Sequence, residues 1–368
     1  MPVEPPRPRT IWRSLDSETV EIIDQTRLPA ALETRCLESL EDAATAIRTM
    51  QVRGAPLIGV TAAYGVALGL AEGNDDATLR DIITILAGTR PTGRDLFTVL
   101  DKMRLSLADL PAADRKAAAW RMADELAEEC VNKCRAIGQN GAELIERIAD
   151  TKKEGPVNVL THCNAGWLAC VEWGTALAPV YVAAERGCNV HVWVGETRPR
   201  NQGAALTCWE LKGGGVPHTL TVDSATGHLM SEGRVDIAIT GADRVLRDGT
   251  VCNKIGTYMK ALAAHDNDVP FYVAIPESTV DRITQPGSGA IPIEERDAEE
   301  VLRANGRAAG GSHASVAVAP PATSAFNPAF DVTPPNLVQG LVTEAGVGPA
   351  TEEGIEALFG PASDEQPA

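Results

Sequence analysis

Short runs of β-branched and apolar residues recur after residue 156, and longer stretches of helical character separate them. The runs are VNVLTH (157–162), NVHVWV (189–194), HTLTV (218–222), VDIAITG (235–241) and FYVAIP (271–276). Strands that alternate with helices form βαβ crossovers, which produce a parallel sheet covered by helices on both faces. The sequence therefore predicts an α/β fold built on a Rossmann-like, doubly wound parallel sheet.

The region before this sheet has a different, mainly helical pattern. A short β-like run over residues 19–25 opens it, and apolar or small residues repeat every four positions between 112 and 149, as in a long amphipathic helix. The polar segment TKKEGP follows. At 368 residues the chain exceeds the usual size of one hydrophobic core. We expect a mainly helical N-terminal domain with short β-structure (1–150) and a second domain that contains the parallel sheet (151–368).

Several local features of the chain lead to further expectations. Residues 55–71 carry no charge, but this segment is short and contains Gly, so a buried helix is favoured over a membrane span. Asp42 is expected to cap the helix that follows it. Residues 303–315 are rich in Gly and Ala and resemble a flexible loop. Cys130 and Cys134 offer two metal ligands in principle, but we interpret them as small apolar residues on a buried helix face.

The charge balance excludes some partners. The chain has 33 Lys and Arg against 50 Asp and Glu, a formal net charge of -17. This charge repels a phosphodiester backbone and an anionic membrane surface, so neither nucleic acid nor membrane is an expected partner.

The eight cysteines indicate a reducing compartment, because they lack the dense spacing of a disulfide framework. The N-terminus, MPVEPPRPRT, has no apolar segment of the secretory type. A cytoplasmic location is predicted. Known signatures of cofactor or hydrolase chemistry are also missing from the sequence: there is no CxxC pair, GxGxxG, GxSxG or HExxH motif. No metal and no cofactor are therefore expected.

Candidate reacting groups follow two of the predicted strands, and ligands of parallel sheets bind beyond the carboxyl ends of strands. Cys163 comes directly after the first run, before a helix-prone stretch whose dipole would favour a thiolate. Asp243 ends VDIAITGAD, and partial burial there would raise the pKa of its carboxyl and make it a proton donor. An Asp-Gly turn after it is expected to fold Asn253 and Lys254 back toward Asp243, which suggests an anionic substrate.

Cationic groups near helix starts suggest a phosphate site. Arg53-Gly54-Ala55 opens the uncharged helix, and Arg90 precedes a second expected helix start. The segment GETRPRNQG (195–203), which includes Gln202, is dense in groups that bind hydroxyls or phosphate. The histidines of the chain, His162 among them, are interpreted as structural.

Taken together, these segments resemble the methylthioribose-1-phosphate isomerase family, over about residues 45–346. The motifs that carry the resemblance are VRGAPLIG, RPT, LTHCNAG, GTALAPVYVAAERG, ETRPRNQGAALT, GADRV, CNKIGTY, IPIEER and NPAFDVTP. The same fold family includes ribose-1,5-bisphosphate isomerases and non-catalytic regulatory subunits of a eukaryotic initiation factor exchange complex.

The resemblance implies roles for individual residues. Asp243 is expected to donate a proton, and Cys163 to act as a stabiliser or acid/base partner. The implied substrate contacts are Arg53, Gly54, Ala55, Arg90, Gln202, Asn253 and Lys254. It also implies a smaller N-terminal domain (1–150) followed by a Rossmann-like catalytic domain (151–368). The substrate is expected to be a sugar phosphate of methionine salvage, and the protein a homodimer with no required cofactor.

The sequence departs from the family pattern near the presumed site, at Trp167, Glu172, Trp173, Gly195, Arg200 and Asn201. These departures leave the substituent at carbon 5 of the sugar open, as methylthio, deoxy or another group. The rival functions are isomerisation of ribose 1,5-bisphosphate or 5-deoxyribose 1-phosphate, and a non-catalytic protein that binds a sugar phosphate. The hydrogen transfer is open to both a proton and a hydride route.

Overall fold

A computed structural model describes residues 9–14, 18–90, 93–287, 289, 291–308 and 313–361. Its largest sheet has seven strands in the order β16-β15-β10-β7-β4-β5-β6. These strands are β4 (Val157–Thr161), β5 (Val190–Gly195), β6 (His218–Thr221), β7 (Ile237–Thr240), β10 (Phe271–Ala274), β15 (Gly340–Thr343) and β16 (Gly346–Gly348). All pairs are parallel except β15 with β16. The predicted α/β fold with a parallel sheet is confirmed, and each predicted run contains a strand.

The winding of this sheet reverses at its centre. From β4 the chain proceeds through β5 and β6 toward one edge, and from β7 through β10 and β15 toward the other. β4 and β7 are neighbours, and the connections that follow them, to β5 and to β10, therefore leave toward opposite edges of the sheet. In open parallel sheets this reversal leaves a crevice beyond the carboxyl ends of the two central strands.

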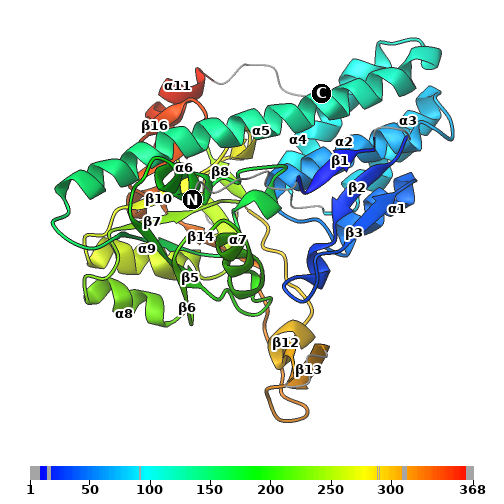
Figure 1. Cartoon of the computed structure of the whole chain (residues 1–368). Coiled ribbons are helices and arrows are strands. Elements are labelled where there is room, and N and C mark those ends of the chain that lie inside the picture. Colours follow the sequence, from blue (N-terminus) through cyan, green and yellow to red (C-terminus); the bar gives the residue numbers. More distant parts are fainter. Residues whose placement is uncertain are drawn as a thin grey trace.

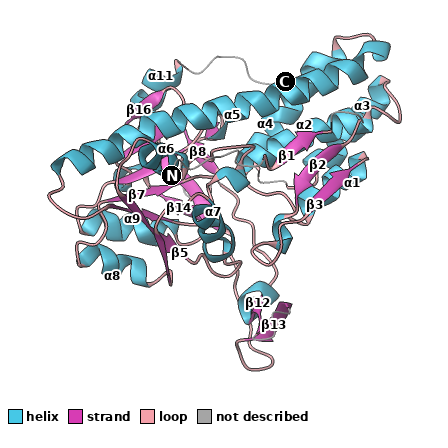
Figure 2. Cartoon of the chain, in the orientation of Figure 1, coloured by secondary structure: helices cyan, strands magenta, loops and turns pink. Residues whose placement is uncertain are grey.

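Helices cover both faces of the sheet (Figures 1 and 2). One face packs against α5 (Ala112–Thr151), α6 (Ala178–Glu185) and α7 (Cys208–Gly213), and the other against α8 (Ala225–Ser231), α9 (Thr257–Asp266) and α11 (Glu352–Phe359). Ile237 and Ile239 of β7 join the first hydrophobic cluster, whereas Ala238 joins the second. This alternation follows from the period of two in a strand and buries both faces.

A separate hydrophobic cluster lies in the N-terminal region. Its elements are β1 (Ile11–Arg13), β2 (Val20–Ile23), β3 (Thr34–Leu37), α1 (Leu40–Arg48), α2 (Ala55–Gly69), α3 (Asp76–Ala87), α4 (Arg94–Ala108) and the first half of α5. The long helix predicted before residue 150 is confirmed as α5, and α2 is a buried helix, as expected. No helix in the described part of the chain combines the length and the apolar run that crossing a bilayer requires.

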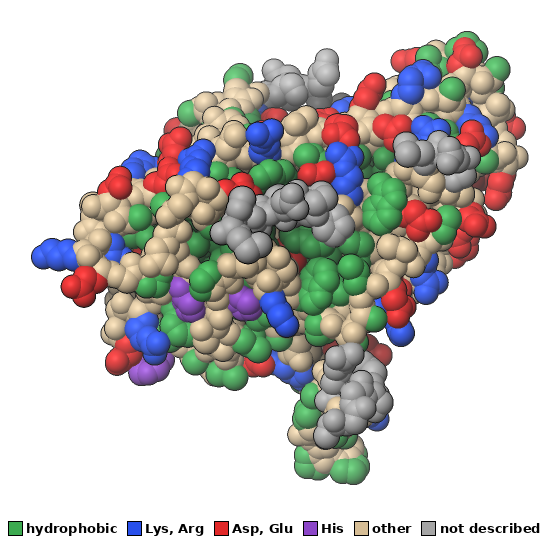
Figure 3. Space-filling model, in the orientation of Figure 1, with side chains coloured by type: hydrophobic (Ala, Val, Ile, Leu, Met, Phe, Trp, Pro, Cys, Tyr) green, Lys and Arg blue, Asp and Glu red, His purple; other side chains and the backbone are tan. Residues whose placement is uncertain are grey.

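Helix α5 runs across the molecule and contributes to both regions (Figure 1). Ala118 and Leu126 belong to the N-terminal cluster, whereas Ile137 and Ile145 belong to the cluster on the parallel sheet. The domain boundary at residue 150 stays a prediction. On the face shown in Figure 3, acidic side chains are frequent over the N-terminal helices, in keeping with the net charge of -17.

A smaller sheet lies beyond the centre of the parallel sheet, with strand order β11-β8-β9-β14. Its strands are β8 (Arg244–Leu246), β9 (Val251–Lys254), β11 (Val280–Asp281) and β14 (Phe330–Thr333). β8 and β9 form the antiparallel hairpin expected from the Asp-Gly turn. The single-turn elements of the chain are η1 (Gln25–Arg27), η2 (Trp167–Ala169), the π-helical η3 (Gly203–Thr207), η4 (Glu277–Thr279) and η5 (Pro335–Leu337).

Two local predictions are wrong. The cap of α1 is Ser39, whose side chain accepts from the backbone N–H of Asp42, so the helix begins earlier than expected and Asp42 lies inside it. The segment predicted as a flexible loop follows α10 (Glu299–Leu302) and forms the hairpin of β12 (Arg303–Arg307) and β13 (His313–Ala317). Backbone pairing forms these strands despite their small residues, and the hairpin projects from the body of the protein (Figure 1).

Candidate active site

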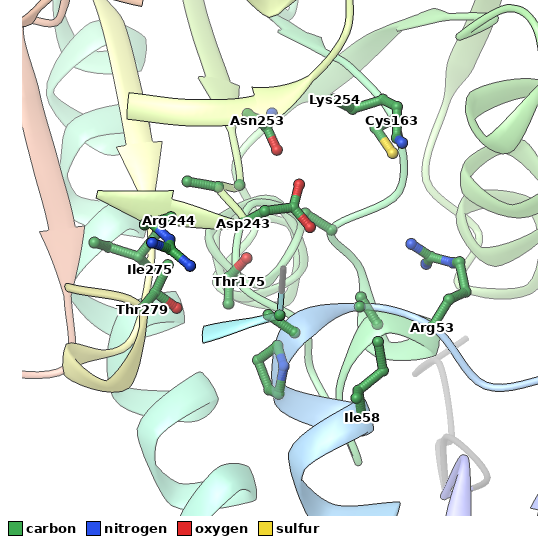
Figure 4. Close-up of a pocket in the computed structure, with 18 of the residues that line it drawn as sticks. Arg53, Ile58, Cys163, Thr175, Asp243, Arg244, Asn253, Lys254, Ile275 and Thr279 are labelled. Atoms are coloured by element: carbon green, nitrogen blue, oxygen red, sulfur yellow. The ribbon is translucent and has the colours of Figure 1, made fainter. Parts of the chain in front are cut away.

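One cavity gathers all the residues predicted to act on the substrate. Its lining includes Arg53, Gly54, Ala55, Arg90, Cys163, Gln202, Asp243, Asn253 and Lys254. Cys163 follows β4 and Asp243 follows β7, so both leave the sheet where its winding reverses. Figure 4 shows Arg53, Cys163, Asp243 and Lys254 reaching this cavity from separate elements.

Cys163 is held in an unusual backbone conformation at the start of the loop after β4. Its φ of 62° lies in the left-handed region, which is rare for a residue with a side chain and occurs often at functional sites. Its backbone N–H donates to Thr197 Oγ1 (2.8 Å), and its Sγ–H donates to Gln202 Oε1 (3.5 Å). One hydrogen bond therefore holds the backbone of Cys163 and another holds its thiol.

The expected thiolate at Cys163 is wrong. Burial raises the pKa of the thiol, while the nearby cations Arg53 and Lys254 act in the opposite direction. The predicted helix after Cys163 is only the short turn η2, so no long helix dipole favours the anion. Cys163 is a protonated thiol at neutral pH.

Asp243 lies at the base of the β8–β9 hairpin, and its backbone N–H donates to the carbonyl of Cys252 (3.0 Å). Burial raises the pKa of its carboxyl, which is the direction expected from the sequence, and the cations Lys254, Arg90 and Arg53 oppose the rise. Asp243 is thus a half-buried acid, and its raised pKa suits a proton donor.

Arg53 is buried beside the loop that carries Cys163. Its Nε donates to Gln25 Oε1 (3.2 Å) and its Nη1 to the carbonyl of Asn164 (2.8 Å). Its Nη2 is buried and, among the described residues, has no hydrogen-bond partner. A buried donor without a partner is costly, so this nitrogen is suited to an anionic ligand.

Lys254, Arg90 and Arg244 also line the cavity, and Arg244 pairs with Asp281 (3.0 Å). Lys254 Nζ lies 4.4 Å from the centre of the Phe330 ring, and burial lowers the pKa of its ammonium group. Arg90 approaches Glu294 at 3.9 Å through Nη2, but its Nε and Nη1 are buried without a partner in the described part of the chain. The neighbouring Pro91 and Thr92 of the RPT motif lie outside the described residues.

The turn before α2 requires glycine. Gly54 has a φ of 93°, and a Cβ placed on it would lie 2.5 Å from the carbonyl oxygen of Ala169. We expect Gly54→Ala to lower the thermal midpoint of unfolding and to disturb the site, because the left-handed conformation costs about 1–2 kcal/mol and the clash adds to it. Thermal unfolding measured beside Gly155→Ala is the check. Gly155 also has a positive φ but has open space around it, so a drop no larger than that of Gly155→Ala would contradict the steric argument.

Glu210 of α7 supports the loop after Cys163, and sequence reasoning missed it. This buried carboxylate accepts hydrogen bonds from the backbone N–H groups of Trp167 (3.0 Å) and Leu168 (2.9 Å) and from Asn164 Nδ2 (2.8 Å). No local signal marks it, because its hydrogen-bond partners, including the hydroxyl of Tyr181 (3.3 Å), all lie at least 29 positions away.

A second buried polar network lies beneath Cys163. Asp223 pairs with Lys260 (3.2 Å) and accepts from the backbone N–H groups of Thr197 (3.0 Å) and Arg198 (2.8 Å). His162 is fully buried, its Nε2 lies 2.8 Å from the carbonyl of Ile255, and burial lowers the pKa of its ring. His162 is therefore a neutral structural histidine. The network also fixes the loop of Thr197, whose Oγ1 accepts the hydrogen bond from the backbone N–H of Cys163.

The residues that depart from the family pattern do not line this cavity. Their positions are Trp167, Glu172, Trp173, Gly195, Arg200 and Asn201. Arg200 and Asn201 line a neighbouring cavity of 370 Å³, which shares Arg53 and Gln202 with the first. Arg200 pairs with Glu300 (2.7 Å), and Arg198 donates to the carbonyl of Val301 (2.8 Å). Both guanidinium groups are thus engaged with the segment before β12.

The chain is similar to known proteins along most of its length. The sequence model of the initiation factor 2 subunit family matches residues 51–350. A methylthioribose-1-phosphate isomerase of Methylorubrum populi is 58% identical over 351 residues, which are 95% of this chain and 96% of the relative. The same name belongs to a relative from Escherichia coli at 53% identity over 352 residues, 95% of this chain and 94% of that one.

Solved structures show the same fold. The 5-methylthioribose 1-phosphate isomerase of Pyrococcus horikoshii superimposes with a TM-score of 0.81 at 35% identity, over 96% of both chains. A structure named as the delta subunit of translation initiation factor eIF-2B from A. fulgidus gives 0.77 at 39% identity, over 95% of this chain and 99% of that one. This chain belongs to the initiation factor 2 subunit family, within which it is similar along nearly its whole length to methylthioribose-1-phosphate isomerases.

Proposed function

We propose that this chain is an aldose–ketose isomerase that converts 5-methylthioribose 1-phosphate to 5-methylthioribulose 1-phosphate in methionine salvage. The observation that carries the proposal is the meeting of a half-buried acid, Asp243, and a thiol, Cys163, with cationic groups in one cavity. The relatives at 53% to 58% identity that bear the isomerase name support it.

The reaction requires an acid. A ribose phosphorylated on its anomeric oxygen has no free anomeric hydroxyl, so the ring opens only when the ring oxygen gains a proton as its bond to carbon 1 breaks. Carbon 2 then loses its hydrogen and carbon 1 gains one. The hydroxyl on carbon 2 releases its proton to become the ketone, and this proton replaces the one that the ring oxygen gained. The atoms balance without any external reactant.

We assign these steps to the two groups of the cavity. Asp243 donates the proton to the ring oxygen, because its raised pKa keeps the carboxyl protonated to a higher pH than an exposed Asp. Cys163 is the acid/base partner beside the carbons that exchange hydrogen. Arg53, Arg90 and Lys254 hold the phosphate, while Gly54, Ala55, Gln202 and Asn253 complete the substrate contacts. The buried position of the cavity keeps water away from the opened sugar.

The pH dependence of kcat/KM tests the role of Asp243. The proton donor must be protonated in the free enzyme, so kcat/KM should fall as pH rises through its raised pKa. Because the shift is upward, this loss should begin at a higher pH than the ordinary titration of Asp. A profile that stays flat as the pH rises from 4 to 9 would assign proton donation to another group.

Substrate comparison tests the proposed specificity. The purified protein is incubated, with a chelator present, with 5-methylthioribose 1-phosphate, its 5-deoxy analogue and ribose 1,5-bisphosphate. We expect the highest kcat/KM for the methylthio compound, because Arg198 and Arg200, which could otherwise hold a second phosphate, are engaged with the segment before β12. A preference for the bisphosphate would overturn the substrate, and absence of turnover with all three would favour a binding protein.

The cellular setting is part of the same proposal. We propose that the protein is a cytoplasmic homodimer. Each chain has the two domains expected from the sequence, with the domain boundary near residue 150. Exposed apolar side chains on α9, Tyr258, Met259 and Leu262, support a contact between subunits. Sedimentation equilibrium should give twice the chain mass of 38.8 kDa, and the single chain mass would contradict the dimer.

A further inference from the structure

Three cysteine sulfurs meet beside the proposed active site, where the N-terminal cluster and the parallel sheet adjoin. Cys130 and Cys134 lie one turn apart on α5 and so share a face, and Cys170 directly follows η2. The three Sγ atoms all lie within 4.8 Å of one another. In the part of the chain that the structure describes, no other His, Cys, Asp and Glu side chains form such a group.

We propose that Cys130, Cys134 and Cys170 bind a divalent thiophilic metal ion of the zinc class. Thiolates are the preferred protein ligands of such ions, and three are enough when a fourth position is open to another ligand. With a metal–sulfur distance of about 2.3 Å, sulfurs around a tetrahedral ion lie about 3.8 Å apart. Because the sulfurs already lie within 4.8 Å, binding requires only small shifts of the side chains.

A fourth ligand position is available in a cavity next to the cluster. This cavity has a volume of 140 Å³, and its lining includes Cys130, Cys134 and Asp95. That volume admits several water molecules and provides access for an ion. The cluster is therefore not enclosed on all sides by packed side chains, as simple buried thiols would be.

Asp95 marks the polar side of this cavity. It is only 2% exposed, and its Oδ1 is buried with no hydrogen-bond partner among the described residues. A buried carboxylate oxygen without a partner is costly unless a ligand satisfies it. Because Asp95 lies outside the group of atoms within 4.8 Å, we assign its oxygen to a water molecule that fills the fourth position on the ion.

Charged side chains surround the cluster. Three thiolates and a divalent ion carry one net negative charge. Lys102 and Lys133 line the same cavity, and both pair with Glu129, which lines it too, at 3.2 Å and 2.8 Å. The two ammonium groups are the cations that can offset the charge of the loaded site.

The ion would join two parts of the fold that are distant in the sequence. Cys170 follows Ala169, whose carbonyl oxygen lies against Gly54 at the start of α2. An ion bound to Cys170 and α5 would therefore fix the end of the loop that begins at Cys163. The bound ion has a structural role and takes no part in the isomerisation. The metal site is therefore independent of the proposed function.

The test uses the reduced, full-length protein and Cd²⁺ as the probe. We expect a thiolate-to-metal absorption in the ultraviolet that saturates at one ion per chain, with release of thiol protons. Cys134→Ser and Cys170→Ser should each weaken Cd²⁺ binding at least about 10-fold. The control Cys188→Ser removes a cysteine outside the cluster and should leave binding unchanged. Cys163→Ser should also retain it.

A second measurement needs no variant and so does not depend on how the variants fold. Alkylation of the native protein followed by peptide mass mapping should show that Zn²⁺ protects Cys130, the partly exposed thiol of the cluster, and leaves the exposed Cys36 reactive. Zn²⁺ should also raise the thermal midpoint, because it binds the folded chain. Protection of Cys163 instead, a disulfide within the cluster with no metal bound, or equal reactivity with and without Zn²⁺ would each overturn the proposal.

Discussion

Replacing Cys163 with Ala or Asp243 with Asn should lower kcat by about 100-fold or more, the usual scale for a positioned acid or base. Each change removes a group that carries a proton and keeps the surrounding backbone. KM should change much less, because the cations that we assign to the phosphate remain in place. Steady-state kinetics on the purified variants give both values.

The matched control for this pair is Cys208→Ala. Burial raises the pKa of Cys208 to about 11, and this thiol does not line the cavity. It should retain the kcat of the unmodified protein. A kcat near that of the unmodified protein in Cys163→Ala or Asp243→Asn would mean that the residue is structural.

Replacing Arg53 with Ala should raise KM by roughly 10- to 150-fold, which corresponds to the loss of one charge-assisted hydrogen bond of about 1.5–3 kcal/mol. The structure suggests this effect because Arg53 Nη2 is buried and unpartnered at the cavity. The inhibition constant of inorganic phosphate should rise in parallel, since the same contact holds both anions. Lys254→Ala should act in the same direction.

Arg198→Ala is the control for the phosphate contact. Its guanidinium group donates to the carbonyls of Val301 (2.8 Å) and Arg303 (3.1 Å), away from the cavity. We expect little change in the inhibition by phosphate. If Arg198→Ala weakens phosphate binding and Arg53→Ala does not, the phosphate lies on the side of the hairpin.

The parallel sheet was predictable because its central strands are buried on both faces. Such strands appear in the sequence as continuous runs of β-branched residues, as in β4 and β7. The last two strands of the sheet, β15 and β16, were missed because they are short and include Gly340, Gly346 and Gly348. The β12–β13 hairpin was missed for a similar reason, since Gly and Ala gave it the composition of a loop.

The candidate site was predictable where chemistry follows a strand. Cys163 and Asp243 directly follow β4 and β7, and the turn between β8 and β9 brought Lys254 to the same place. Glu210, Lys260 and Cys170 could not be found in this way. Each acquires its role from partners that only the tertiary fold brings near.

The most direct test of the central claim follows 5-methylthioribose 1-phosphate by NMR in the presence of the purified protein and a chelator. We expect the anomeric signal of the sugar to disappear, and signals of a ketone carbon and of two hydrogens on carbon 1 to appear. Asp243→Asn should slow this conversion by about 100-fold or more. An unchanged spectrum after prolonged incubation with folded protein would contradict the claim.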